Sequence, residues 1–178
     1  EEAFKKAKKL YGNVATIGIT DPERAATDLA EARTNIDIAA ANPDAVNPKN
    51  LYKLWETRAS IYNDIANNYI NKKVLDDTYE GNLDGNPAIE AFNAVRSGME
   101  VPELKKWQTK ELLKMMLTTA NYLSNFGGIY YGDQDYAGAF NSFEKTLDAR
   151  NILVDKGVND FLAKDEEYHE QMFSVAVC

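Results

Sequence analysis

Residues 120–153, ANYLSNFGGIYYGDQDYAGAFNSFEKTLDARNIL, decide the fold of this chain. Within this segment, apolar and small side chains recur at spacings of three and four, which is the period of an amphipathic helix. The recurring positions are Leu123, Phe126, Gly127 and Tyr130 in the first half, and Ala139, Phe143 and Thr146 in the second. The run GDQD at 132–135 has the composition of a turn. The segment therefore predicts two antiparallel helices joined by a short loop.

The rest of the chain carries the same helical period, and runs of strict alternation with β-branched residues are short and rare. Helix starts are marked by polar residues and proline, as where Thr20 or Asp21 can cap a helix and Pro22 suits its first turn. The predicted helices cover 2–17, 22–41, 48–73, 87–97, 102–131, 135–155 and 165–178. The sequence therefore predicts an all-α protein that forms a single domain over 1–178.

The landmarks in 120–153 resemble those of the tetratricopeptide repeat (TPR), a helix pair of about 34 residues with the pattern W-x2-L-G-x2-Y followed by A-x3-F. Four landmarks match in identity and spacing, namely Gly127, Tyr130, Ala139 and Phe143. In such a hairpin a small residue at Gly127 lets the helices approach closely, and Gly128 belongs to the same packing feature. We therefore expect Tyr130 and Phe143 to be largely buried between the two helices.

A second, looser copy of the pattern lies earlier in the chain. WETRASIY at 55–62 matches the first helix and AIEAFNAV at 88–95 the second, with roughly 17 extra residues between them. The resemblance implies a right-handed α-solenoid of TPR-like antiparallel helix hairpins, with an insertion in one repeat. The implied units are 1–45, 48–98 and 102–155, and a further unit starts at 165–178.

The charge and composition of the chain exclude several classes of binding partner. The 178 residues include 20 Lys and Arg against 28 Asp and Glu, so the net charge is −8. This charge opposes attraction to phosphate backbones and anionic lipids, and we expect no nucleic-acid partner. No stretch approaches the roughly 20 consecutive apolar residues of a membrane span, so no membrane insertion is expected. Cys178 is the only cysteine, which excludes an internal disulfide and a cysteine-based metal cage.

No motif indicates catalysis, a metal or a cofactor. His169 is the only histidine and has no second histidine or cysteine at helical spacing. The loop at 80–86 resembles the start of a calcium loop, but Ala91 stands at the twelfth position, where a bidentate Glu is needed. Acidic pairs such as Glu166 and Glu167 are interpreted as solvated. We therefore predict that the protein is not an enzyme and carries no cofactor.

The resemblance implies a concave groove lined by the first helix of each repeat. Its partner-binding positions would be Lys53, Glu56, Ser60, Asn63, Asn121, Ser124 and Tyr131, beside Asp64 and Gly128. Family members that clamp a terminal carboxylate use Lys, Asn and Arg at such positions, whereas Glu56, Ser60 and Ser124 stand here. The resemblance therefore implies hydrogen bonding and aromatic contact with a partner other than a terminal acidic peptide.

The first hypothesis is a non-catalytic scaffold that binds a protein or peptide in this groove. The alternative is an exported glycan- or small-ligand-binding helical-repeat protein of an outer-membrane uptake system, which the many Tyr and Asn residues favour. A third is a structural module that self-associates through an open C-terminal face. The abundance of Asn, Thr and Tyr resembles that of exported bacterial proteins, so a periplasmic location is an expectation, and the compartment stays open.

Overall fold

The computed structural model describes residues 1–81, 83–158 and 165–178, and within these ranges the chain is all-α with no strand. The predicted fold class is therefore confirmed at the level of helix content. The α-helices of the described residues are α1 (Glu2–Ile17), α2 (Pro22–Ala40), α3 (Leu51–Leu75), α4 (Pro87–Met99), α5 (Lys106–Gly132), α6 (Tyr136–Asp155) and α7 (Asp165–Val177). Two short 3₁₀ turns, Pro43–Ala45 and Pro48–Asn50, connect α2 to α3.

Polar caps and prolines fix several helix starts. The side chain of Asp21 accepts a hydrogen bond from the backbone N–H of Arg24 at 3.0 Å, ahead of Pro22 in the first turn of α2. Asn86 caps α4 in the same way, and Asp135 caps α6. Each cap satisfies a backbone donor that has no partner inside its own helix. The turn residues read from the sequence therefore mark these three starts correctly.

Two predicted starts are wrong by a few residues. Helix α5 begins at Lys106 rather than at 102, because Glu103 has a φ of 57° and so lies in the left-handed region, outside the helical one. Helix α3 begins at Leu51 rather than at 48, because Pro48–Asn50 forms a 3₁₀ turn. The α4–α5 connection is therefore a longer irregular loop than the sequence indicated.

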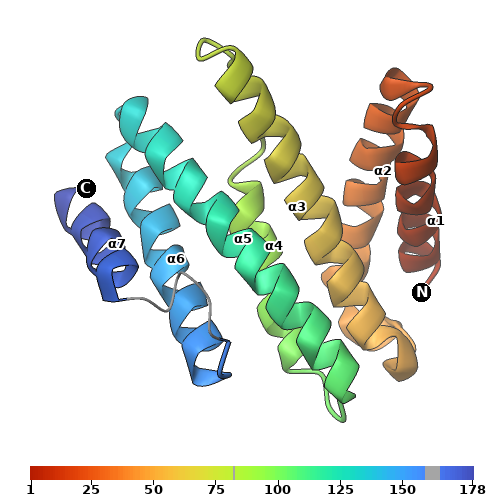
Figure 1. Cartoon of the computed structure of the whole chain (residues 1–178). Coiled ribbons are helices and arrows are strands. Elements are labelled where there is room, and N and C mark those ends of the chain that lie inside the picture. Colours follow the sequence, from red (N-terminus) through yellow and green to blue (C-terminus); the bar gives the residue numbers. More distant parts are fainter. Residues whose placement is uncertain (82, 159–164) are drawn as a thin grey trace.

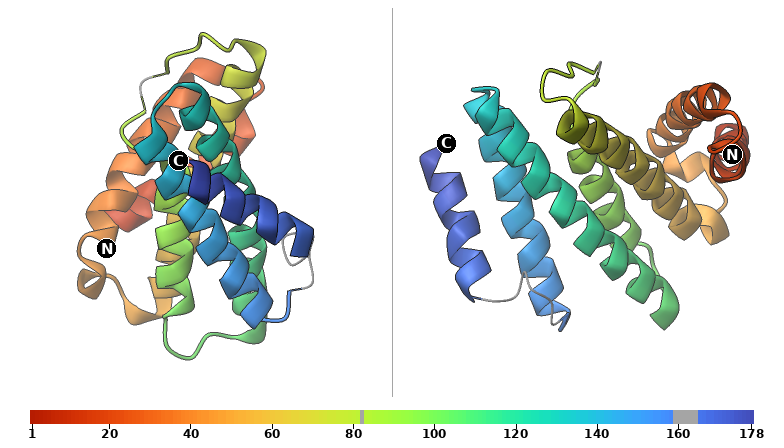
Figure 2. Two further views of the ribbon diagram at one scale, coloured as in Figure 1. Left: turned by 90° about the vertical axis from the view of Figure 1, so that its left-hand side faces the viewer. Right: turned by 45° about the horizontal axis from the view of Figure 1, so that its top comes forward.

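Consecutive helices pack against each other as neighbours (Figure 1). The closest pairs are α1 with α2, α3 with α4, and α5 with α6, while α3 also contacts α5, and α7 packs on α6. The N-terminus and the C-terminus lie at opposite edges of this row, as the right-hand view of Figure 2 shows. The arrangement is compatible with a helical repeat fold.

The core consists of two clusters. Phe92 on α4 and Phe126 on α5 are fully buried in the larger one, between α3, α4, α5 and α6. Ile36 and Leu54 belong to the smaller one, between α1, α2 and α3. Trp55 packs against both clusters. The apolar faces are therefore shared between successive helix pairs, as the helical period indicated.

The α5–α6 hairpin is packed around Gly127. A Cβ placed at Gly127 would overlap the ring of Phe143, which is itself buried. The predicted close approach at Gly127 is therefore confirmed. Tyr130 is only half-buried, so its burial is less complete than expected. The packing role expected for Gly128 is wrong, because a Cβ there would meet nothing within 4 Å.

A charged network joins α2, α3 and α4. Arg58 on α3 donates from Nε to Asp37 Oδ1 at 3.1 Å and from Nη2 to Glu90 Oε2 at 2.7 Å. The hydroxyl of Tyr62 donates to the other oxygen of Asp37 at 2.6 Å, and burial together with this carboxylate raises the pKa of Tyr62 to about 12. The network therefore ties the second helix pair to the first.

Within the described residues, no helix has both the length and the apolar character needed to cross a membrane.

Candidate binding site

Side chains from α1, α3 and α5 line a shallow depression of about 430 Å³ that opens widely to solvent. We call it the groove cavity. Its lining residues are Tyr11 from α1, Ser60, Asn63 and Asp64 from α3, and Glu111, Lys114, Met115, Leu117 and Thr118 from α5. Because these helices belong to three different neighbouring pairs, the cavity exists only when the pairs are stacked.

The α3 wall comes from one helical turn, Ser60 to Asp64. Residues three and four apart share a face of a helix, so these side chains project in a similar direction. The hydroxyl of Ser60 donates to the backbone oxygen of Glu56 at 2.9 Å. Asn63 is 8% exposed, and its side-chain oxygen accepts a hydrogen bond from the hydroxyl of Thr119 at 3.0 Å. Asn63 therefore holds α3 against α5 as well as lining the cavity.

Asp64 and Tyr11 close the cavity on the side of α1. The Tyr11 hydroxyl donates to Asp64 Oδ2 at 2.8 Å. Burial, followed by the negative charge of Asp64, raises the pKa of the Tyr11 phenol above its ordinary value. Desolvation raises the pKa of Asp64, while the hydrogen bond from Tyr11 acts in the opposite direction. Tyr11 therefore stays a protonated donor at neutral pH and fixes the position of the Asp64 carboxylate.

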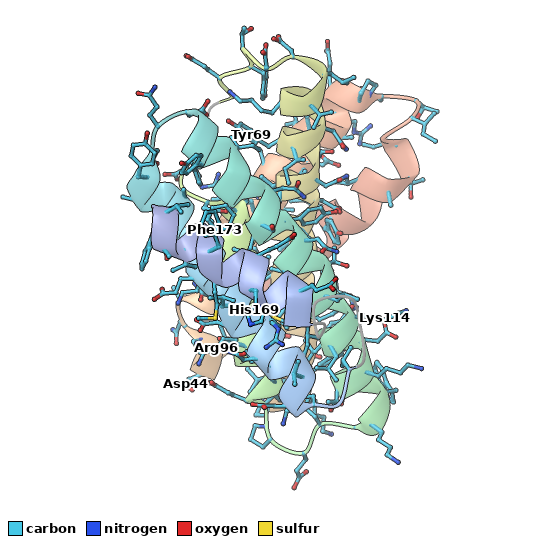
Figure 3. The ribbon with its side chains drawn as sticks, turned by 60° about the vertical axis from the view of Figure 1, so that its left-hand side comes forward. Asp44, Tyr69, Arg96, Lys114, His169 and Phe173 are labelled. Atoms are coloured by element: carbon cyan, nitrogen blue, oxygen red, sulfur yellow. The ribbon has the colours of Figure 1, made fainter. Side chains whose placement is uncertain are left out.

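The α5 wall combines charged, apolar and hydroxyl groups. Lys114 lies 3.9 Å from Glu111 and its side chain is 69% exposed. Figure 3 shows Lys114 pointing away from the ribbon of α5 into solvent. Met115 is half-buried, and the Thr118 hydroxyl donates to the backbone oxygen of Lys114 at 3.3 Å. This wall therefore offers an apolar surface with hydrogen-bonding groups at its edge.

The structure places the predicted α3 residues together along one helix. Ser60 and Asn63 line the groove cavity, as does Asp64. Lys53 and Glu56 lie one to two turns earlier and form an ion pair of 2.6 Å. The charge of Glu56 is one of the causes that raise the pKa of Tyr11, so Glu56 lies near the same cavity.

The predicted α5 residues lie further along that helix than the groove cavity. Asn121 lies three residues beyond Thr118, the last α5 residue that lines the groove cavity, and Tyr131 lies thirteen residues beyond it, about 20 Å along the helix at about 1.5 Å per residue. Asn121 and Ser124 are half-buried and do not line the groove cavity. The predicted set is therefore divided between two places.

Tyr131 belongs to a second, smaller cavity at the C-terminal edge. Its ring is 44% exposed and meets the ring of Tyr136 edge-on, with centroids 5.5 Å apart. The cavity, of about 220 Å³, is lined by Gly128, Tyr131, Phe143, Phe173, Ser174 and Val177. Figure 3 labels Phe173 on α7, where it is 67% exposed. An open apolar edge is therefore present there, and self-association through it stays a prediction.

The sequence did not predict the lining residues that α1 and α5 contribute. These are Tyr11 on α1 and Glu111, Lys114, Met115, Leu117 and Thr118 on α5. The helix that carries Tyr11 lacks the Trp and Gly landmarks, so no groove position was assigned to it. The α5 landmarks start at Leu123, whereas the helix spans 27 residues from Lys106. A usable signal was the spacing of Glu111, Met115 and Thr118, which places all three on one face of α5.

Among the residues that the structure describes, no group of three or more His, Cys, Asp or Glu side chains could hold a metal ion. In the loop that resembles a calcium site, Asn82 lies outside the described residues. Asp84 pairs with Arg33 at 2.8 Å, and Asn86 caps α4. Both side chains therefore have structural partners.

Comparison with protein-family models, with curated proteins and with solved structures finds no match to this chain.

Proposed function

We propose that this protein is a non-catalytic scaffold of TPR-like helix hairpins, wound as a right-handed α-solenoid, which binds a protein or peptide partner in the groove cavity. The observation that carries the proposal is the composition of that cavity from three stacked helix pairs. A repeat array gains an extended binding surface by stacking units, and here the surface lies across α1, α3 and α5.

The chemistry of the cavity supports a peptide as the occupant. Met115 and Leu117 supply apolar contact, while Ser60, Thr118 and Asp64 supply hydrogen-bonding groups. A volume of about 430 Å³ accommodates a few side chains, and the wide opening leaves room for a backbone to pass across it. The Tyr11–Asp64 hydrogen bond fixes one wall before any partner arrives, which lowers the entropy lost on binding.

The test is selection from a library of displayed random peptides, with a variant that fills the cavity. In Thr118→Arg, a long charged side chain replaces a lining residue that is exposed on α5. Thr34→Arg is the matched control, because Thr34 is also exposed on a helix and donates to the backbone oxygen four residues earlier, at 3.2 Å. Equal circular dichroism spectra establish that both variants fold.

Peptides enriched on the parent should bind Thr34→Arg equally well and lose at least tenfold in affinity for Thr118→Arg. If no peptide distinguishes the parent from Thr118→Arg, the groove proposal is wrong. A parallel oligosaccharide array screens the alternative function. Glycans retained by the parent and released by Thr118→Arg would replace the peptide as the partner.

A further inference from the structure

Another cavity lies away from the groove cavity, at the end of the molecule where the α4–α5 loop meets the start of α3. Its volume is about 530 Å³, and it shares no lining residue with the groove cavity. We call it the end cavity. Its lining residues are Pro48, Lys49, Leu51, Tyr52, Val101, Pro102, Glu103, Leu104, Lys105 and Gln108. Both segments lie at the lower end of the molecule in Figure 1.

The floor of the end cavity is apolar. Val101 and Leu104 pack against the larger core cluster, and Tyr52 is a buried member of that cluster. Beside the cavity, the ring of Trp107 meets Tyr52 edge-on with centroids 5.5 Å apart, and Trp107 is 56% exposed. An exposed indole next to an apolar cavity is unfavourable in water, and an apolar ligand could cover it.

The rim of the end cavity carries two lysines. Lys49 and Lys105 come from separate segments of the chain, and within the described residues neither has an ion-pair partner. In contrast, nearby Lys53 is paired with Glu56 at 2.6 Å. In a chain with a net charge of −8, two unpaired ammonium groups at one cavity form a local positive region.

Glu103 is the acidic residue of the lining, and its backbone is strained. Its φ of 57° lies in the left-handed region, which is costly for a residue other than glycine. Burial raises the pKa of Tyr52, and the charges of Glu56 and Glu111 contribute to this shift, so negative charge also lies behind the floor. Lys53 neutralises Glu56, and Glu111 lies 3.9 Å from Lys114. Glu103 is therefore the acidic group that opposes an anion at the rim.

We infer that the end cavity binds a small amphipathic anion, with an apolar body on the floor formed by Tyr52, Val101 and Leu104 and a carboxylate between Lys49 and Lys105. The volume of about 530 Å³ is within the range of small-molecule sites. This inference does not depend on the proposed peptide groove, because the two cavities have no residue in common.

The experiment compares three probes that share a ten-carbon chain, used below their micelle concentrations: decanoate, decanol and decyltrimethylammonium. Binding to the full chain is measured by isothermal titration calorimetry and by tryptophan fluorescence. Trp107→Phe serves to assign the fluorescence change, since Trp55 is the other tryptophan. We expect decanoate to bind most tightly and to change the fluorescence of Trp107.

Charge variants locate the carboxylate. Lys105→Met keeps an unbranched side chain but removes the terminal ammonium group, and we expect decanoate affinity to fall roughly three- to tenfold, as for loss of a partly screened charge contact. Lys106→Met is the matched control, because Lys106 is the next residue, is exposed and does not line the cavity. Glu103→Gln should strengthen binding by a similar factor, because it removes the opposing charge.

The inference is overturned if decanoate fails to bind, if decanol or the cationic probe binds as tightly, or if Lys105→Met and Lys106→Met have the same effect. The peptide selection tests the groove cavity independently of the end cavity, since Thr118→Arg leaves the end cavity unaltered. Failure of one proposal therefore does not decide the other.

Discussion

The two adjacent glycines in α5 provide the sharpest test of the hairpin packing. A Cβ at Gly127 would overlap the ring of Phe143, whereas a Cβ at Gly128 would meet nothing within 4 Å. Both residues lie in the interior of a 27-residue helix, so helix propensity predicts the same gain of about 1 kcal/mol for each Gly→Ala change. Any difference between the two variants therefore reports the contact with Phe143.

The size of the expected stability change in Gly127→Ala follows from the contact with Phe143. The Phe143 ring is 8% exposed and cannot swing into solvent without uncovering the hairpin, so the added methyl group overpacks the site at a cost of about 1–3 kcal/mol. After the gain in helix propensity, Gly127→Ala should change stability by between zero and about 2 kcal/mol in the destabilising direction. Gly128→Ala should stabilise by about 1 kcal/mol.

The assay is urea unfolding followed by circular dichroism, with thermal melts as a second measurement. At about 2–4 °C per kcal/mol for a chain of this size, the two melting temperatures should differ by about 2–12 °C. Phe143→Leu combined with Gly127→Ala should recover part of the loss, because the smaller side chain makes room for the methyl group. If both alanine variants are stabilised equally, Gly127 has no packing role and the hairpin assignment is wrong.

Three further predictions concern the core, the charged network and the groove. Phe143→Ala should cost about 3–5 kcal/mol in urea unfolding, and a melting temperature within a degree of the parent would contradict the burial of its ring. Arg58→Met removes the cation of Glu90 and leaves Asp37 only the longer contact with Arg33 at 4.0 Å, so it should cost about 2–4 kcal/mol, whereas Arg24→Met, on the exposed start of α2, should stay within about 0.5 kcal/mol in the same assay. Asp64 has a raised pKa in the folded state, so its contribution to stability is present below its unfolded pKa of about 3.9 and is lost as the pH rises through the folded value. The urea midpoint of Asp64→Asn should therefore rise relative to the parent between about pH 3 and pH 7, and a gap that does not vary with pH would refute this sign.

The helix order and the α5–α6 hairpin could be predicted because they depend on local signals. Asp21, Asn86 and Asp135 are capping residues whose effect lies within one helical turn, and Gly127 and Phe143 belong to one short motif. The start of α5 could not be predicted, because Pro102 also suits the first turn of a helix. The left-handed φ of Glu103 depends on how the loop packs at the end cavity and is not encoded by its residue type.

The candidate site could be predicted only where its residues depend on local sequence signals. Ser60, Asn63 and Asp64 follow from the phase of α3, which the matched pattern at 55–62 fixes. Tyr11 reaches Asp64 across 53 positions of sequence, and no local pattern reports that approach. The phase of the repeat landmarks predicts Asn121 and Tyr131 as groove residues, but both lie further along α5 than Thr118, the last residue of that helix to line the groove cavity.

The end cavity uses residues of the α4–α5 loop and the start of α5, from Val101 to Gln108, and the groove cavity uses the next part of α5, from Glu111 to Thr118. None of these residues belongs to 120–153, the segment whose landmarks indicate the hairpin. The landmark position Gly127 is occupied by helix packing, and Phe143, which packs against it, lines only the smaller cavity at the C-terminal edge. The first half of α5 lies ahead of Phe126, and there Leu112 and Met116 are buried in the core, while Lys110, Glu111, Lys114 and Thr118 are exposed. The extra length of α5 therefore supplies surface that the packing of the hairpin does not require, and both proposals place part of their binding site on that surface.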